Sequence, residues 1–120
     1  MRILESGNPD LQTQALAVLG TSAVNALEVR RGMKDCGAIP LLVSLLGSKN
    51  AAVQEWAAYA LRKAASKASD PALGKAIIEV ADDAGATRML VRMVDLRSRE
   101  AVEEAQQTLE YFGVQVGRYL

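Results

Sequence analysis

The sequence has 120 residues, of which 50% are hydrophobic and only 4% are aromatic, and its 14 basic and 14 acidic residues give a net charge of zero. A chain of this length forms one domain with a substantial core, and a hydrophobic content rich in Ala and Leu favours packed helices over sheets. The balanced charge excludes the large basic field typical of proteins that bind nucleic acid or anionic lipid.

The first complete helical pattern runs from Asp10 to about Thr21. Pro9 suits the first turn of this helix, where a missing N–H costs little, and Thr21 or Ser22 marks the expected end. Residues 1–5 are expected to be the remnant of a preceding helix. Apolar positions at helical spacing predict the face that turns inward, namely Leu11, Ala15, Val18 and Leu19.

A short helix is predicted next, from Ala23 to Lys34, with Val24, Leu27, Val29 and Met33 available for burial. Gly37 follows it in the position of a left-handed C-cap. Cys36 is the only cysteine and cannot form an internal disulfide. A small apolar side chain at this position predicts packing between helices, and the alternative is a reactive thiol.

The stretch from Gly37 to Ser66 predicts two amphipathic helices joined by a tight polar turn at residues 47–50. Pro40 lies near the start of the first helix, and Asn50 is the expected N-cap of the second. The two apolar faces consist of Ile39, Leu42, Val43, Leu45 and Leu46, and of Val53, Trp56, Ala57, Ala60, Leu61 and Ala64. Two such helices cannot bury both faces against each other, so they need similar neighbours, which is the signature of a repeat protein.

Within this stretch the order of residue types is specific. It contains Gly37-Ala38-Ile39-Pro40, Leu42-Val43-Ser44-Leu45-Leu46, Val53-Gln54-Glu55-Trp56-Ala57-Ala58 and Ala60-Leu61. This order strongly resembles the second and third helices of an armadillo repeat. The resemblance implies an all-α, right-handed armadillo-like superhelix, a solenoid of about two and a half three-helix repeats forming a single domain.

Internal repetition agrees with this expectation. An offset of 42 residues brings Ser48 onto Ser6, Asn50 onto Asn8, Ala57 onto Ala15 and Leu61 onto Leu19. An offset of 48 brings Gly37 onto Gly85, Ala38 onto Ala86, Val43 onto Val91, Ala57 onto Ala105 and Leu61 onto Leu109. Such periods suit helical repeats and divide the chain into a partial unit at about 1–22, units at 23–69 and 70–112, and a tail at 113–120 that is a cap or the start of a further unit.

The last unit repeats the pattern of caps and breaks. Asp70 is expected to cap and Pro71 to begin a helix over 72–82, which Gly85 ends. Helices are then expected over 86–96 and, after a cap at Ser98, over 99–112. Their inward residues are Leu73, Ile77, Ile78 and Val80, then Met89, Leu90, Val91, Met93 and Val94, then Val102, Ala105, Leu109 and Phe112.

Residues able to carry catalysis are scarce. The sequence has no histidine, its one cysteine cannot form a thiolate zinc site, and it contains no phosphate loop, dinucleotide fingerprint or nucleophile elbow. We therefore expect a non-catalytic protein with no cofactor and no metal, and we interpret Asp82 and Asp83 as a solvated helix end. A helical-repeat lyase is the remote alternative.

The resemblance also implies a candidate binding groove. In armadillo proteins the third helices line a concave groove in which a Trp, and an Asn four residues later, hold an extended peptide. By alignment the Trp position falls on Ala17, Tyr59 and Gln107, and the Asn position falls on Thr21, Lys63 and Tyr111. Lysine offers only donors where asparagine offers a donor and an acceptor, so this groove suits a mixed apolar and acidic segment. Trp56 lies on the neighbouring face and is interpreted as packing, or alternatively as an interface anchor.

The densest basic cluster is Arg88, Arg92, Arg97 and Arg99. Asp95, Glu100 and Glu103 are close enough in sequence to neutralise it. The cluster is therefore either a solvated, paired face or a site for an acidic partner.

The combined expectation is a protein–protein interaction scaffold, with an accessory or docking subunit of a multisubunit complex as the first hypothesis and a peptide-binding adaptor as the second. No polar cap is visible at residues 1–20, so we expect either a fragment of a longer array or end faces packed on neighbouring chains. No segment approaches the roughly 20 apolar residues of a membrane span, and no signal-peptide core is present. A soluble, intracellular protein is expected, either cytoplasmic or organellar after loss of a targeting segment.

Overall fold

Two asparagine side chains, 42 residues apart in the sequence, cap the N-terminal ends of helices. The structure is a computed structural model that describes residues 7–25, 27–65, 70–93 and 99–112. In it Asn8 Oδ1 accepts hydrogen bonds from the backbone N–H groups two and three residues later, at 3.0 and 3.3 Å. Asn50 Oδ1 does the same at 2.9 and 3.1 Å. Each side chain satisfies N–H groups that have no partner within the helix, so the offset of 42 joins equivalent helix starts.

Two glycines fix the sharp turns between helices in the second and third units. Gly37 and Gly85 have φ angles of 80° and 94°, in the left-handed region that glycine adopts without strain. They lie 48 residues apart, as the predicted repeat requires. Asp70 caps the helix before the second of these turns by accepting from the backbone N–H of Leu73 at 3.0 Å, and this hydrogen bond lowers the pKa of the Asp70 carboxyl below its ordinary value of 3.8.

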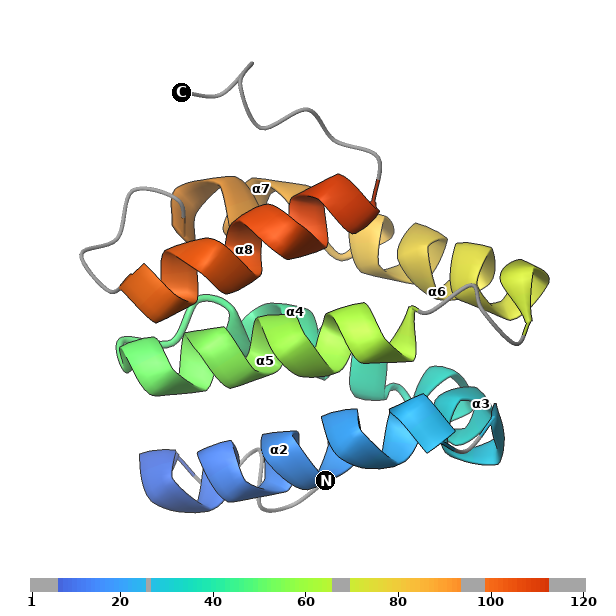
Figure 1. Cartoon of the computed structure of the whole chain (residues 1–120), viewed down its shortest axis with the longest axis horizontal. Helices are drawn as coiled ribbons and strands as arrows, with labels where there is room; N and C mark the ends of the chain where they lie inside the picture. The colour runs from blue at the N-terminus through green and yellow to red at the C-terminus, as the bar shows by residue number, and fades with distance from the viewer. Residues whose placement is uncertain (1–6, 26, 66–69, 94–98, 113–120) are drawn as a thin grey trace.

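The described residues form seven helices and no strand. These are α2 (Pro9–Asn25), α3 (Leu27–Asp35), α4 (Ala38–Leu45), α5 (Ala51–Ala64), α6 (Pro71–Asp83), α7 (Ala86–Met93) and α8 (Arg99–Tyr111). The third helices of successive units, α2, α5 and α8, lie side by side in one layer, and α4 and α7 lie behind α5 and α8 (Figure 1). The chain is therefore a short helical solenoid.

The core lies between these two layers and is built mainly from aliphatic side chains. Its largest fully buried apolar residues are Leu16, Ile39, Leu42, Leu46, Leu61, Ile77, Leu90, Met93, Leu109 and Val53. Leu61 and Leu109, which the offset of 48 makes equivalent, are both fully buried, as predicted. Trp56 is half-buried and packs against the core, in agreement with its interpretation as a packing residue.

Helix boundaries in the first unit differ from the prediction. The helix expected to end at Thr21 or Ser22 continues to Asn25, and the next one begins at Leu27. No glycine or proline interrupts residues 21–31, so nothing in the local sequence stops the helix earlier. The predicted helix remnant at 1–5, the end of the helix at 94–96, the cap at Ser98 and the tail at 113–120 lie outside the described residues.

We predict that Leu61→Ala lowers the free energy of unfolding by about 2–5 kcal/mol, because its fully buried side chain would leave a cavity between the layers. Urea denaturation followed by circular dichroism measures the loss. Leu11→Ala, at a side chain that is 44% exposed, is the matched control and should cost under about 1 kcal/mol. A loss at Leu61 as small as that of the control would contradict the assigned core.

Candidate functional site

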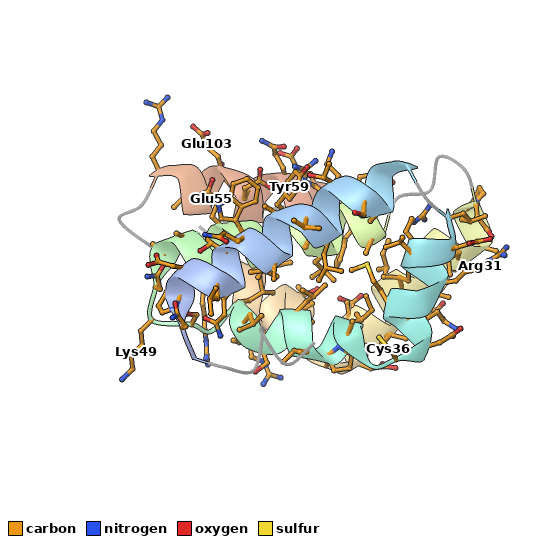
Figure 2. The ribbon with its side chains drawn as sticks, turned by 90° about the horizontal axis from the view of Figure 1, so that it is seen from below. Arg31, Cys36, Lys49, Glu55, Tyr59 and Glu103 are labelled. Carbon is orange, nitrogen blue, oxygen red and sulfur yellow. The ribbon has the colours of Figure 1, made fainter. Side chains whose placement is uncertain are left out.

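The exposed side of the α2–α5–α8 layer holds the predicted groove residues. Tyr59 and Lys63 are half-buried on α5, Thr21 and Gln107 are exposed on α2 and α8, and Tyr111 is half-buried near the end of α8. Figure 2 shows Tyr59, Glu55 and Glu103 on this side of the molecule, whereas Cys36 and Lys49 lie on the side of α4. The predicted positions therefore share one surface, which we call the third-helix face. Its use as a binding groove stays a prediction.

Tyr59 is the centre of this face. Its ring meets the ring of Trp56 edge-on, with centroids 5.2 Å apart and planes at 82°. Lys63 Nζ lies 5.6 Å and Arg62 Cζ lies 5.9 Å from the centroid of the Tyr59 ring, which are cation–π distances. The face thus presents an aromatic platform flanked by positive charge.

Only one of these two cations, Arg62, is also held in an ion pair. Arg62 Nη2 forms an ion pair with Glu104 Oε2 at 3.1 Å, linking α5 to α8, and both side chains are largely buried. Among the described residues Lys63 has no ion-pair partner. The charge that the face offers to an incoming group is therefore that of Lys63.

The Tyr59 ring depends on a glycine in the neighbouring helix. A Cβ atom added to Gly20 of α2 would lie 2.6 Å from Tyr59 Cδ1 and 3.3 Å from Ala60 Cα. Since real Cβ contacts are longer, only glycine at this position lets the ring and the α5 backbone approach α2 so closely.

Three polar contacts in the interior were not predicted from the sequence. Arg30 is only 2% exposed, and its Nε donates to the Ala64 carbonyl at 2.9 Å, which ties α3 to the end of α5. The fully buried Thr108 hydroxyl lies 3.4 Å from the Ala58 carbonyl and 2.7 Å from that of Glu104. The third contact is the Arg62–Glu104 ion pair already described. Periodicity counts apolar residues only, so it carries no signal for these groups.

A second candidate surface is the outer face of α2. Leu11 and Val18 were predicted to turn inward, and this prediction is wrong, since they are 44% and 65% exposed. No described helix lies on their side of α2. Val18 also lines a shallow cavity of about 290 Å³ together with Ala17, Thr21 and Ser22.

The third candidate surface belongs to the predicted basic patch. Arg88 and Arg92 are exposed on α7 and line a cavity of about 600 Å³ with Asp82, Gly85, Thr87 and Val91. Arg99 lies on α8 and pairs instead with Glu103, 3.0 Å away. Arg97 lies outside the described residues. The structure therefore brings two of the four arginines together and leaves them unpaired among the residues it describes.

Chemical groups elsewhere on the described chain form no metal site, since no three acidic, Cys or His residues cluster there. Cys36 was predicted to pack between helices, but its thiol is exposed. The turn at Gly37 places it at the surface of the corner between α3 and α4, where its Sγ lies 3.9 Å from the Met33 carbonyl. Within the described residues no helix is long and apolar enough to cross a membrane.

Comparisons with known proteins agree with this geometry. A family model described as "Armadillo/beta-catenin-like repeat" matches residues 33–66. The chain is 30% identical over 123 aligned positions to Protein CELLULOSE SYNTHASE INTERACTIVE 2 of Arabidopsis thaliana, and the match covers 96% of this chain but only 5% of that protein. The chain thus spans a small part of the length of the curated relative.

Solved structures with the same fold include engineered proteins. One, from the Northeast Structural Genomics Consortium, is 29% identical and superposes with a TM-score of 0.81, covering 92% of this chain and 42% of that one. A designed armadillo repeat protein is 23% identical with a TM-score of 0.75, covering 92% of this chain and 44% of that one. These matches confirm the all-α armadillo-like superhelix expected from the sequence.

We predict that Gly20→Ala destabilises the protein by about 1–3 kcal/mol, although alanine is the better helix former, because the new methyl group meets the Tyr59 ring and the α5 backbone. Urea denaturation measures the change, and displacement of Tyr59 should alter the fluorescence of Trp56. Gly47→Ala is the matched control, since its methyl would meet the end of the flexible Met89 side chain and would lie at an ordinary van der Waals distance of 3.4 Å from the Ser44 carbonyl, and it should change stability by under about 0.5 kcal/mol. A stabilised Gly20→Ala variant would contradict the close approach.

Proposed function

The chain is an armadillo-repeat protein, and from this premise we propose that it is a non-catalytic interaction scaffold that docks in a larger assembly through the outer face of α2. The name of the Arabidopsis relative describes a protein that interacts with cellulose synthase, which supports interaction as the general role. Function inferred from fold is an analogy, so the proposal rests on a surface of this chain.

The observation that carries the proposal is the exposure of one repeat position, compared between the third helices α2, α5 and α8. Val18, Ala60 and Thr108 are equivalent under the offsets of 42 and 48. Ala60 is fully buried against Gly20 of α2, and Thr108 is fully buried with its hydroxyl near the α5 backbone. Each therefore faces the preceding third helix. Val18 occupies the same position and is 65% exposed.

Leu11 strengthens the same inference. It is equivalent to Val53, which is fully buried and lies two turns before Ala60 on the same side of α5. The outer face of α2 therefore carries the two apolar positions that α5 buries when it packs on α2. Covering the exposed parts of Leu11 and Val18 would contribute about 2–3 kcal/mol, and the natural occupant is a further helix packed as α2 packs on α5.

The proposal is tested by the self-association of the purified chain in sedimentation velocity. The exposed apolar face of α2 should make the chain associate at high protein concentration. Val18→Glu should shift the population to monomer, because a carboxylate cannot be buried unpaired. Ala72→Glu adds the same charge at an exposed position of α6, on another helix, and should leave association unchanged. A wild-type chain that stays monomeric at high concentration, or equal effects of both variants, would count against docking through this face.

A second candidate function is a peptide-binding adaptor that uses the third-helix face. The observation in its favour is the Tyr59 platform, with Trp56 at its edge and beside it Lys63, which has no ion-pair partner in the part of the chain that the structure describes. Aromatic rings bind apolar side chains and an ammonium group binds carboxylates, so this combination suits a segment with both.

Binding to this face can be followed through Trp56, the only tryptophan in the sequence. Peptides selected by phage display on the wild-type chain should change its fluorescence. They should bind the Tyr59→Ala, Lys63→Ala double variant at least about tenfold more weakly, with helicity intact. Lys49→Ala removes one charge on the side of α4 and is the control. Equal affinity for the double variant and the control would remove the groove hypothesis.

A further inference from the structure

The outer face of α7 lies at the opposite end of the stack from α2 (Figure 1). It carries the cavity of about 600 Å³ lined by Asp82, Gly85, Thr87, Arg88, Val91 and Arg92. Asp82 Oδ1 accepts from the Thr87 hydroxyl at 2.8 Å, so this carboxylate already has a partner. Neither guanidinium has an ion-pair partner among the described residues.

The equivalent helix in the preceding unit shows what such a face can bind. Helix α4 packs against α3, α5 and α6, whereas α7 packs against α6 and α8, the equivalents of α3 and α5. Among the described helices none occupies, on α7, the place that α6 takes on α4. Ile39 and Val43 of α4 are 0% and 3% exposed, whereas their equivalents Thr87 and Val91 are only half-buried. The cavity on α7 is therefore the counterpart of the surface on which α6 packs, and no described helix fills this helix seat.

The charge of this seat differs from that of its counterpart. Arg88 and Arg92 replace Pro40 and Ser44, both exposed on α4. They lie one helical turn apart, so their guanidinium groups can reach the same ligand, and such groups bind carboxylates with paired hydrogen bonds. The partner that fits has an apolar stripe for the cavity and acidic residues beside it.

We propose that the outer face of α7 binds an acidic amphipathic helix of a partner protein, seated as α6 is seated on α4. Nucleic acid fits less well, because Asp82 lines the cavity and the side chain of Val91 offers nothing to a phosphate. This surface is separate from α2 and from the third-helix face, so its failure in an experiment leaves the proposed function untouched.

The test uses the full chain and a helix-stapled peptide with the sequence of residues 71–83, the segment that covers α4, with its lysine changed to glutamate. Isothermal titration calorimetry should detect binding to the wild-type chain. Arg88→Glu with Arg92→Glu should weaken it at least about tenfold, since attraction becomes repulsion. The control, Lys49→Glu with Lys75→Glu, makes the same change in net charge at two exposed positions that do not line the cavity, and it should bind like wild type.

A second peptide, with its acidic residues changed to amides, should bind at least about tenfold more weakly than the first. Circular dichroism of each variant verifies that the fold is kept. Absence of binding, equal weakening by the two double variants, equal affinity for the acidic and amide peptides, or a preference for a short single-stranded RNA of the same charge would each overturn the proposal.

Discussion

The close approach of neighbouring third helices is the contact on which the rest of the structure depends. At Gly20 the absence of a side chain lets the Tyr59 ring and the Ala60 backbone lie against α2. At the next interface the small Thr108 side chain lies near the α5 backbone in the same way. Tight packing of this kind loses stability when even a methyl group is added, so it fixes the spacing of the layer. The third-helix face, with its aromatic platform, follows from that spacing.

The two ends of the described stack are chemically different. On α2 the repeated position is Val18, which leaves an apolar outer face. On α7 the positions that correspond to Pro40 and Ser44 carry arginines, which leaves a basic outer face around an apolar cavity. A scaffold with unlike ends can bind unlike neighbours, because the partner of each end is selected by different physical terms, burial of apolar area in one case and charge pairing in the other.

Much of the fold could be predicted from the sequence, because caps, turn glycines and apolar spacing act locally. Asn50, Asp70, Gly37 and Gly85 all have the predicted roles. Exposure could not be predicted in the same way. Leu11 has the helical spacing of a buried residue, yet whether a side of a helix is covered depends on its neighbours rather than on its own sequence.

In the candidate sites, too, the local features could be predicted and the contacts between distant parts of the chain could not. Alignment with an armadillo repeat placed Tyr59 and Lys63 on the exposed face of the third helices. It could not show that Arg62 is bound to Glu104, 42 residues away, because such a pairing exists only once α5 and α8 are adjacent. Nor could it show that Arg99 forms an ion pair with Glu103, whereas Arg88 and Arg92 on α7 have no ion-pair partner among the described residues.

A double-mutant cycle between Gly20 and Tyr59 tests the central contact most directly. The free energy of unfolding is measured for wild type, Gly20→Ala, Tyr59→Ala and the double variant. If the two residues touch, alanine at position 20 should destabilise the protein more beside tyrosine than beside alanine, where only the 3.3 Å contact with the Ala60 backbone remains, and the coupling energy should be about 1 kcal/mol or more. Additive effects, within about 0.3–0.5 kcal/mol, would mean that the helices are not packed as described.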